Sequence, residues 1–317
     1  MSDGPTRRTA ILTSLALLSP AAPETAKQSL KVAIFSKHLQ FLEGTELAHT
    51  VAQIGFDGID LTVRAGGHVD PARAAEDLPP LVYVIRQNGL EVPMVTTDIV
   101  DVASPNARTV LKTIADLGIF RYRWGGFKYE ADQPLPHQFD GFRRRSAQLA
   151  DLNSEYGVCA MYHTHSGVNL VGAPVWDIFE ILNGLDRKAV GINYDIGHAT
   201  VEGGLGGWID SFRLAEAYIR GVAFKDFLWQ KNARGNWDPA WVPLGQGMVR
   251  FPTFCSMLAG ANFNGPVQLH FEYPLSGANE GDRTISVPRE QILSAMRRDL
   301  LQLRTYLNDA GFSHAQA

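Results

Sequence analysis

The stretch AVGINYDIGH, residues 189–198, joins an apolar run to two side chains that can bind a metal ion. Its first four residues, Ala189 to Ile192, predict a buried strand. Asp195 ends this strand and His198 lies beyond a glycine-containing turn, which places an oxygen and a nitrogen ligand close together in the chain. Such a pair suits a divalent ion. An Asp that caps a following helix, with a His in a solvated loop, would give the same pattern.

Short apolar runs and helical patterns alternate on both sides of this stretch. The predicted strands are residues 31–36, 58–63, 92–97, 122–125, 158–163, 189–195, 221–225 and 267–272. The predicted helices are residues 46–54, 70–88, 106–117, 135–156, 175–185, 208–218, 251–258 and 288–309. Several strands are nearly continuous in apolar residues, as in parallel strands that are covered on both faces. Four helices end beside a glycine that can adopt a left-handed cap.

Eight strand–helix units predict an α/β protein that folds as a (β/α)8 TIM barrel. A doubly wound open sheet is the competing fold, but it would usually have a glycine-rich turn after the first strand. Here that strand is followed by SKHL, residues 36–39. No change in composition divides the chain, so we predict a single domain at residues 28–317.

The first 27 residues have the order of a secretory signal. Arg7 and Arg8 precede an apolar run from Ala10 to Leu18, and small residues and prolines follow. The run is too short to span a bilayer, so we expect no stable membrane insertion of the mature chain. Paired arginines are also a feature of the twin-arginine export signal. We expect an exported, periplasmic protein that uses either the twin-arginine route or the general secretory route. The alternative interpretation of this segment is a disordered N-terminal tail.

Composition excludes some classes of protein. The chain of 317 residues has a net charge of −4 and lacks the basic stripe that binds nucleic acid. Cys159 and Cys255 are too few for a disulfide framework, which favours two reduced thiols.

Chemically active side chains follow most of the predicted strands, and barrel strands end at a common mouth. They are Arg64 and His68, Arg123 and Trp124, His163 and His165, Asp195 and His198, Lys225 and Asp226, and His270 and Glu272. His163 and His165 are two residues apart and share a face, as do His270 and Glu272. Asp195, Glu272 and one or two histidines could therefore surround one ion such as Mn²⁺, Zn²⁺, Fe²⁺ or Co²⁺. Core histidines bonded to the backbone, and a salt bridge between Lys225 and Asp226, are the structural alternatives.

The longest predicted connection, residues 226–250, contains Trp229, Trp237 and Trp241. A long loop on this side of a barrel is rarely a simple connector. We predict that it forms a wall or lid over the site.

Several motifs, in this order, resemble those of the xylose isomerase-like TIM-barrel superfamily, which includes inosose dehydratases and ketose 3-epimerases. They are GFDGIDL (55–61), YDIGH (194–198), FKD (224–226), PLGQG (243–247), GPV (265–267) and FEY (271–273). The resemblance extends from residue 31 to about residue 305. It implies a sugar isomerase or epimerase, and it places this chain in a subgroup whose fifth strand reads His-x-His.

The resemblance also implies one divalent metal ion, and Mn²⁺ is the first choice. The family's ligands are an acid on strand five, an Asp on strand six, a His on strand seven and a Glu on strand eight. Asp195 and Glu272 match two of them, and His163 occupies the strand-five position. Ala223 occupies the strand-seven position, so a further ligand would come from His165, His198 or His270, or the ion is weakly bound or absent.

Because His163 replaces a glutamate, the resemblance implies a single-base reaction as readily as a two-base epimerisation. Isomerisation, or elimination and hydration of a keto-sugar, would then pass through an enediolate. The residues implied for catalysis are Glu272, His165 and Lys225. Glu272, His165 or His163 would move the proton, and Lys225 would hold substrate oxygens. Those implied for substrate binding are Arg64, His68, Arg123, Trp124, His198, Asp226, Trp229 and His270.

The expected partner is a small sugar. Export favours an unphosphorylated sugar, since phosphosugars are cytoplasmic. The sequence does not decide whether the chain forms a homodimer. Two other classes remain. Ala223 favours a non-catalytic carbohydrate-binding barrel with a degenerate metal site. A phosphoesterase related to endonuclease IV shares this barrel, but it would need three ions and a basic face.

Overall fold

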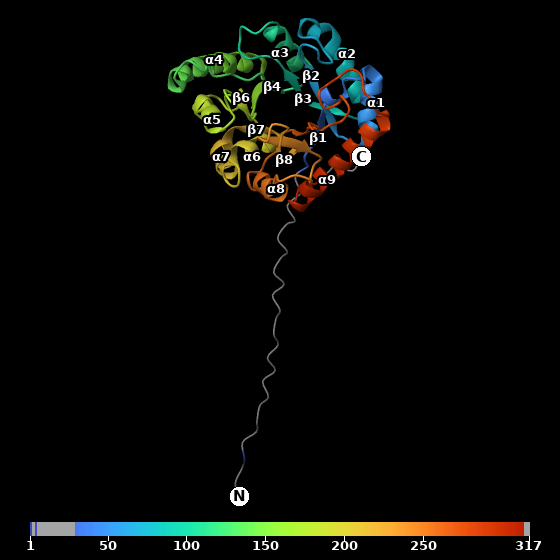
Figure 1. Cartoon of the computed structure of the whole chain (residues 1–317), viewed down its shortest axis with the longest axis vertical. Coiled ribbons are helices and arrows are strands. Elements are labelled where there is room, and N and C mark those ends of the chain that lie inside the picture. The colour runs from blue at the N-terminus through green and yellow to red at the C-terminus, as the bar shows by residue number, and fades with distance from the viewer. Residues whose placement is uncertain (2–3, 5–28, 314–317) are drawn as a thin grey trace.

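The computed structural model of the protein describes residues 1, 4 and 29–313, and in this part eight parallel strands close into a barrel (Figure 1). The order around the barrel is β1-β10-β7-β6-β5-β4-β3-β2. The strands are β1 (Val32–Phe35), β2 (Gly58–Val63), β3 (Glu91–Thr97), β4 (Arg121–Trp124), β5 (Cys159–His163), β6 (Val190–Asp195), β7 (Ile219–Phe224) and β10 (Val267–Leu269). The predicted (β/α)8 barrel is therefore confirmed. The predicted export signal and the exact domain limits lie largely outside the described residues.

Helices surround the barrel on its outer side (Figure 1). They are α1 (Gly44–Ile54), α2 (Ala74–Gln87), α3 (Ala107–Asp116), α4 (Leu135–Tyr156), α5 (Trp176–Leu182), α6 (Ile196–Gly203), α7 (Gly207–Ala215), α8 (Phe251–Gly260) and α9 (Arg289–Asp309), with short 3-10 helices at Ser36–Leu39, Pro71–Arg73 and Glu216–Tyr218. Among the described helices, none is long and apolar enough to cross a membrane. Helix α6 was not predicted, because a turn was expected after Asp195.

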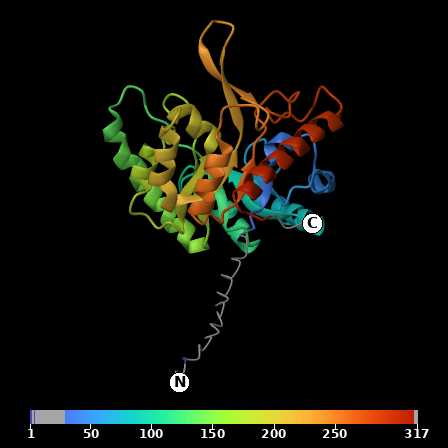
Figure 2. The same cartoon turned by 90° about the horizontal axis from the view of Figure 1, so that it is seen from below.

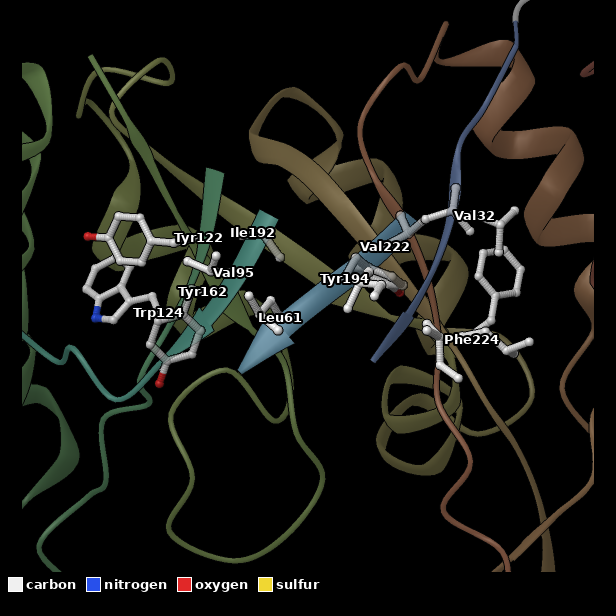
Figure 3. Close-up of a cluster of buried hydrophobic side chains, with 14 of the residues drawn as sticks. Val32, Leu61, Val95, Tyr122, Trp124, Tyr162, Ile192, Tyr194, Val222 and Phe224 are labelled. Carbon is white, nitrogen blue, oxygen red and sulfur yellow. The ribbon is translucent and has the colours of Figure 1, made fainter. Parts of the chain in front are cut away.

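The large apolar core lies between the barrel and the helices. Alternate residues of each strand point outward into it, as Ile192 and Tyr194 do on β6 and Val222 and Phe224 do on β7. Figure 3 shows these side chains together with others from neighbouring strands. The outer face of the strands therefore stabilises the fold by packing against the helices.

The inner face of the strands carries different residues. Near its middle, Met94, Cys159 and Met161 form a small separate apolar cluster. Closer to the C-terminal ends of the strands the buried residues become polar, and Asn193 and Gln268 are both fully buried there. The inner face of the strands thus becomes more polar toward the mouth of the barrel.

A β-hairpin stands out from the barrel after β7 (Figure 2). Its strands are β8 (Asp226–Lys231) and β9 (Trp237–Val242), paired antiparallel. The Asp226 carboxylate anchors the hairpin, because it accepts hydrogen bonds from the backbone N–H groups of Phe227, Gly245, Gly247 and Val249. The predicted loop is thus an ordered hairpin, and its last residues reach the barrel mouth.

Candidate active site

A pocket of about 280 Å³ opens at the C-terminal ends of the strands. The residues that line it come from seven barrel strands or the segments just after them and from the hairpin strand β9, and they are Phe35, Lys37, Arg64, Arg123, His163, His165, His198, Lys225, Trp241, His270 and Glu272. Eight of the residues predicted from the sequence are therefore brought together, and buried Asp195 contacts four of them. The pocket collects histidines and charged groups from distant parts of the chain.

Asp195 uses its two carboxylate oxygens differently. Its Oδ1 accepts the backbone N–H of His198 at 3.0 Å and so caps helix α6. The cap brings α6 so close to β7 that a Cβ atom on Gly197 would lie 2.8 Å from the carbonyl oxygen of Lys225. Its Oδ2 is buried and has no hydrogen-bond partner in the part of the chain that the structure describes. The cap and the ligand interpretations of this motif are therefore compatible.

Two histidines approach the free oxygen of Asp195. His163 Nε2 lies 3.4 Å from Oδ2 and His270 Nδ1 lies 4.0 Å from it. Ligand atoms that share one ion through bonds of about 2.1 Å are at most about 4.2 Å apart. These three side chains therefore have the spacing of a metal-ligand set without large movement. The Nε2 atom of His270 is a second buried polar atom without a partner among the described residues.

A pair of buried amides lies beneath His163. Asn193 and Gln268 donate to each other's amide oxygens at 3.1 Å, and Asn193 Nδ2 lies 3.0 Å from His163 Nδ1. In this orientation the amide donates to Nδ1 and the imidazole proton is on Nε2. A half-turn of the Asn193 amide would move the proton to Nδ1 and free Nε2 to bind an ion. Asn193 therefore controls whether His163 is a donor or a ligand.

A second cluster, His163, His165 and His198, lies on the other side of the pocket. His198 Nε2 is 2.6 Å from Lys225 Nζ, and its Nδ1 is 2.8 Å from the Ser166 hydroxyl. Because the lysine ammonium can only donate, His198 accepts from Lys225 and donates to Ser166. His198 is already committed to protein partners, which leaves His163 and His270 as better ligands.

The electrostatics of the pocket favour neutral imidazoles. Burial lowers the pKa of His163, His198 and His270 well below 6.5, and it lowers the pKa of His165 to about 3. The charge of Lys225 lowers all four further. Neutral imidazole is the form that binds metal ions.

The pKa of the Asp195 carboxyl shifts in the direction that suits a ligand. Burial alone would raise this pKa, but the charge of Lys225 and the hydrogen bond from the backbone amide of His198 lower it more, so the net pKa is below 3.8. At neutral pH the pocket thus offers an ionised carboxylate and neutral histidines. This donor set fits a borderline divalent ion such as Mn²⁺, Zn²⁺, Fe²⁺ or Co²⁺.

Glu272 lies at the edge of the cluster. Its Oε1 is 4.0 Å from His270 Nδ1, its Oε2 is 3.5 Å from Lys37 Nζ, and its side chain is 23% exposed. It belongs to neither of the two compact groups of ligand atoms. Glu272 is therefore better placed to meet a bound molecule than to complete the ligand set of His163, Asp195 and His270.

Four predictions of substrate contact need correction, because the side chains lie outside the pocket lining. Asp226 uses both oxygens to anchor the hairpin. His68 bonds to the Thr62 hydroxyl and the carbonyl of Leu42. The indole of Trp124 points into the outer core and donates to the carbonyl of Val100 (Figure 3). Trp229 is on the hairpin, 40% exposed, and lines a different hollow.

The structure adds residues that the sequence did not indicate. Trp241, on β9, covers the pocket: its ring lies 4.4 Å from Lys225 Nζ and 5.1 Å from the His198 ring. Phe35 and Lys37 enter from the end of β1. The only sequence signal for them was position, since Trp241 belongs to the Trp-bearing connection and Phe35 is the last residue but one of the strand predicted at residues 31–36.

Comparisons with known proteins agree with this geometry. Residues 48–296 match the family model described as "Xylose isomerase-like TIM barrel". Among solved structures, zinc-bound IolI superposes with a TM-score of 0.67 at 14% identity, over 87% of this chain and 99% of that chain.

Two further solved structures are similar in fold. D-psicose 3-epimerase from Clostridium cellulolyticum, with D-tagatose, has a TM-score of 0.63 at 14% identity, over 88% and 99% of the two chains. A probable 3-DHS dehydratase from Bacillus anthracis has a TM-score of 0.63 at 16% identity, over 86% and 99%. A search of curated proteins finds no match.

Proposed function

Because the chain belongs to the xylose isomerase-like TIM barrel family, we propose that it is a divalent-metal-dependent isomerase or epimerase of an unphosphorylated sugar or keto-sugar. The observation that supports this most directly is the buried set of His163, Asp195 and His270 around Oδ2 of Asp195, which forms no hydrogen bond with the described residues although Lys225 Nζ lies 3.3 Å from it. A buried polar atom without a partner costs about 1–3 kcal/mol. Such a cost is expected where a ligand supplies the missing partner.

His270 resolves the difficulty that Ala223 raised. In the barrel Ala223 pairs with Asp195 on one side and with Gln268 on the other. His270 follows Gln268 by two residues and points to the same inner face. We propose that His270 supplies the ligand that Ala223 lacks.

The metal ion would polarise a substrate carbonyl and the neighbouring hydroxyl. The proton on the carbon that bears this hydroxyl would then be easier to remove. Mn²⁺ is our first choice, and Zn²⁺, Co²⁺ and Fe²⁺ are the alternatives. The neutral state of the histidines and the ionised state of Asp195 prepare the site for any of these ions.

Of the proposed bases, Glu272 has the better position. Burial raises the pKa of its carboxyl, but the charge of Lys225 and weaker effects of His38 and Lys37 lower it more, so the group is ionised at neutral pH. His165 is neutral, but its Nε2 accepts from Arg123 at 3.0 Å. His165 would have to exchange this partner before it could take a proton. We propose that Glu272 removes the proton and that Lys225 donates to a developing negative oxygen, with His165 as the alternative base.

A dehydratase is the second candidate function. It would start with the same proton removal and then expel a hydroxyl group from the adjacent carbon. The similar fold of the Bacillus anthracis protein motivates this alternative. A carbohydrate-binding barrel without turnover is the third.

Two wider expectations accompany the proposal. The signal-like segment at residues 1–27 supports export to the periplasm, where unphosphorylated sugars are available. A homodimer is an open expectation for the assembled protein.

Metal analysis and a sugar panel test the proposal together. We expect about one divalent ion per chain, and a rise in melting temperature with Mn²⁺ or Co²⁺ that His270→Gln reduces. On a panel of aldo- and keto-sugars, Glu272→Gln should lower turnover about 10²- to 10⁴-fold. Glu91→Gln, at the opposite end of the barrel, is the control and should retain activity. Protein that binds no metal and turns over no sugar would contradict the proposal.

A further inference from the structure

The charged residues that line the pocket are unevenly paired. Lys37 Nζ lies 3.5 Å from Glu272 Oε2, and Lys225 Nζ lies 3.3 Å from Asp195 Oδ2. Each of these two cations therefore has a carboxylate of its own. The other two cations of the lining are arginines, and a metal ion at the proposed site would increase the positive charge of the pocket further.

Arg64 and Arg123 form no ion pair among the residues that the structure describes. Both guanidinium carbons lie 5.5 Å from the centroid of the Phe35 ring, and both side chains line the pocket. Arg123 donates to His165 Nε2, and the Arg64 guanidinium forms no hydrogen bond with residues 29–313. The two arginines thus present unused donors around one aromatic ring.

Asp60 neutralises this pair only in part. It lies fully buried inside the barrel, and its oxygens accept the Thr96 hydroxyl at 2.9 and 3.0 Å. Burial raises the pKa of its carboxyl to about 7 in spite of the nearby arginines, so a large fraction is uncharged near neutral pH. The guanidinium charges therefore await an anion from outside the protein.

We propose that the substrate is a sugar acid, such as a uronate or an aldonate, whose carboxylate is bound by Arg64 and Arg123 while its sugar carbons face the His163–Asp195–His270 set. The guanidinium group is a planar fork that matches a carboxylate. This inference rests on the proposed function and adds the substrate class to it.

A phosphate is the competing anion, and the lining disfavours it. Phosphates are usually held by backbone N–H groups of glycine-rich loops and helix N-termini. Among the described residues that line this pocket, none is a glycine. A carboxylate bound by two arginines needs no such loop.

Equilibrium binding to the metal-loaded protein tests the inference. The probes are D-glucuronate, D-galacturonate and D-gluconate, compared with D-glucose, D-fructose and D-glucose 6-phosphate, by calorimetry at low ionic strength. At least one acid should bind about tenfold or more tightly than its neutral counterpart, and added salt should weaken binding of the acid but not of the neutral sugar. Arg64→Gln should weaken the acid about 10- to 100-fold, a much larger loss than for the neutral sugars.

Arg121→Gln is the matched control, because Arg121 begins the same strand as Arg123 but lies at the opposite end of the barrel. It should bind acids like the wild type. Arg64→Lys should retain part of the affinity, since it keeps the charge but not the fork. The Arg64 variants must keep the metal-dependent rise in melting temperature, which shows that the site is intact.

The outcomes separate this inference from the proposed reaction. Equal binding of acids and neutral sugars, absence of binding by any acid, or tighter binding of the phosphate overturns the sugar-acid inference. Turnover of neutral sugars alone would retain the reaction and overturn the inference. Tight, Arg64-dependent binding of an acid that is not turned over would retain the sugar-acid inference and overturn the proposed reaction.

Discussion

The Nζ atom of Lys225 lies 3.3 Å from Oδ2 of Asp195, the oxygen that we propose binds the metal ion. Both side chains are almost fully buried. A lysine ammonium and a divalent cation would repel each other strongly at such a distance in a buried site. Lys225 therefore compensates the charge of Asp195 in the absence of metal, and it has to turn toward substrate oxygens when metal binds.

Replacing Lys225 with methionine should consequently have opposite effects on stability and on metal affinity. The metal-free variant loses the partner of a buried carboxylate, so its melting temperature should fall. Its metal affinity should rise roughly tenfold or more, because the competing charge is gone. Calorimetric titration with Mn²⁺ and thermal unfolding with and without metal measure both effects. A fall in metal affinity would mean that Lys225 supports the site rather than competing for it.

The two oxygens of Asp195 can be tested separately. Asp195→Asn keeps an oxygen for the cap of α6 but removes the charge, so it should bind metal at least about tenfold more weakly with a modest change in stability. Asp195→Ala also loses the cap and should be less stable than Asp195→Asn by about 1 kcal/mol. Metal titration and urea unfolding distinguish the variants. Full metal binding by Asp195→Asn would exclude this residue as a ligand.

Apolar periodicity was enough to predict the barrel strands, because the outer face of each strand has to be apolar. Eight predicted strands overlap the eight barrel strands, and Asp195 and the two-residue spacing of His163 and His165 pointed to the mouth. The hairpin and helix α6 could not be predicted in this way. Both depend on backbone groups bound by one carboxylate, Asp226 for the hairpin and Asp195 for α6.

The errors at the site have a simple physical cause. Arg123 and Trp124 are neighbours on β4, and adjacent residues of a strand face opposite sides. Both could therefore not line the pocket, and alternation alone would have assigned Trp124 to the outer core, where it lies. Trp241 could not be chosen over Trp229 from the sequence, because the register of the hairpin decides which ring returns to the barrel.

The two hairpin tryptophans provide a matched pair of variants. Trp241 covers Lys225 and His198, so Trp241→Ala should expose the pocket to water and lower substrate affinity about tenfold or more, since burial of a large aromatic ring contributes strongly to binding. Trp229→Ala removes a 40% exposed ring outside the pocket and should change affinity less than threefold or so. Binding titrations with the best sugar ligand compare them. Equal losses would place both rings in the substrate site.

The buried histidines predict how stability depends on pH. Burial lowers the pKa of His38, which is fully buried, to about 4, whereas an unfolded chain has a histidine pKa of 6.5. Between these values the unfolded state binds a proton that the folded state refuses, so acidification from pH 6.5 toward pH 4 lowers the free energy of unfolding. The contribution of one such histidine is up to about 1.4 kcal/mol per pH unit. His68 has the same direction of shift, also to about 4.

We therefore expect unfolding by urea, measured in EDTA so that metal binding does not contribute, to become much easier from pH 7.5 to pH 5. Above pH 6.5 these histidines are neutral in both states and should add no pH dependence. Between pH 7.5 and pH 5 the free energy of unfolding of His38→Gln should fall by about 2 kcal/mol less than that of the wild type. The reason is that one proton-binding site of the unfolded chain is gone. Glutamine can still accept the backbone N–H of Phe271 and donate to the carbonyl of Ala278, as His38 does. An unchanged pH dependence in His38→Gln would show that His38 takes up its proton in the folded state, so that its burial would not be the source of acid sensitivity.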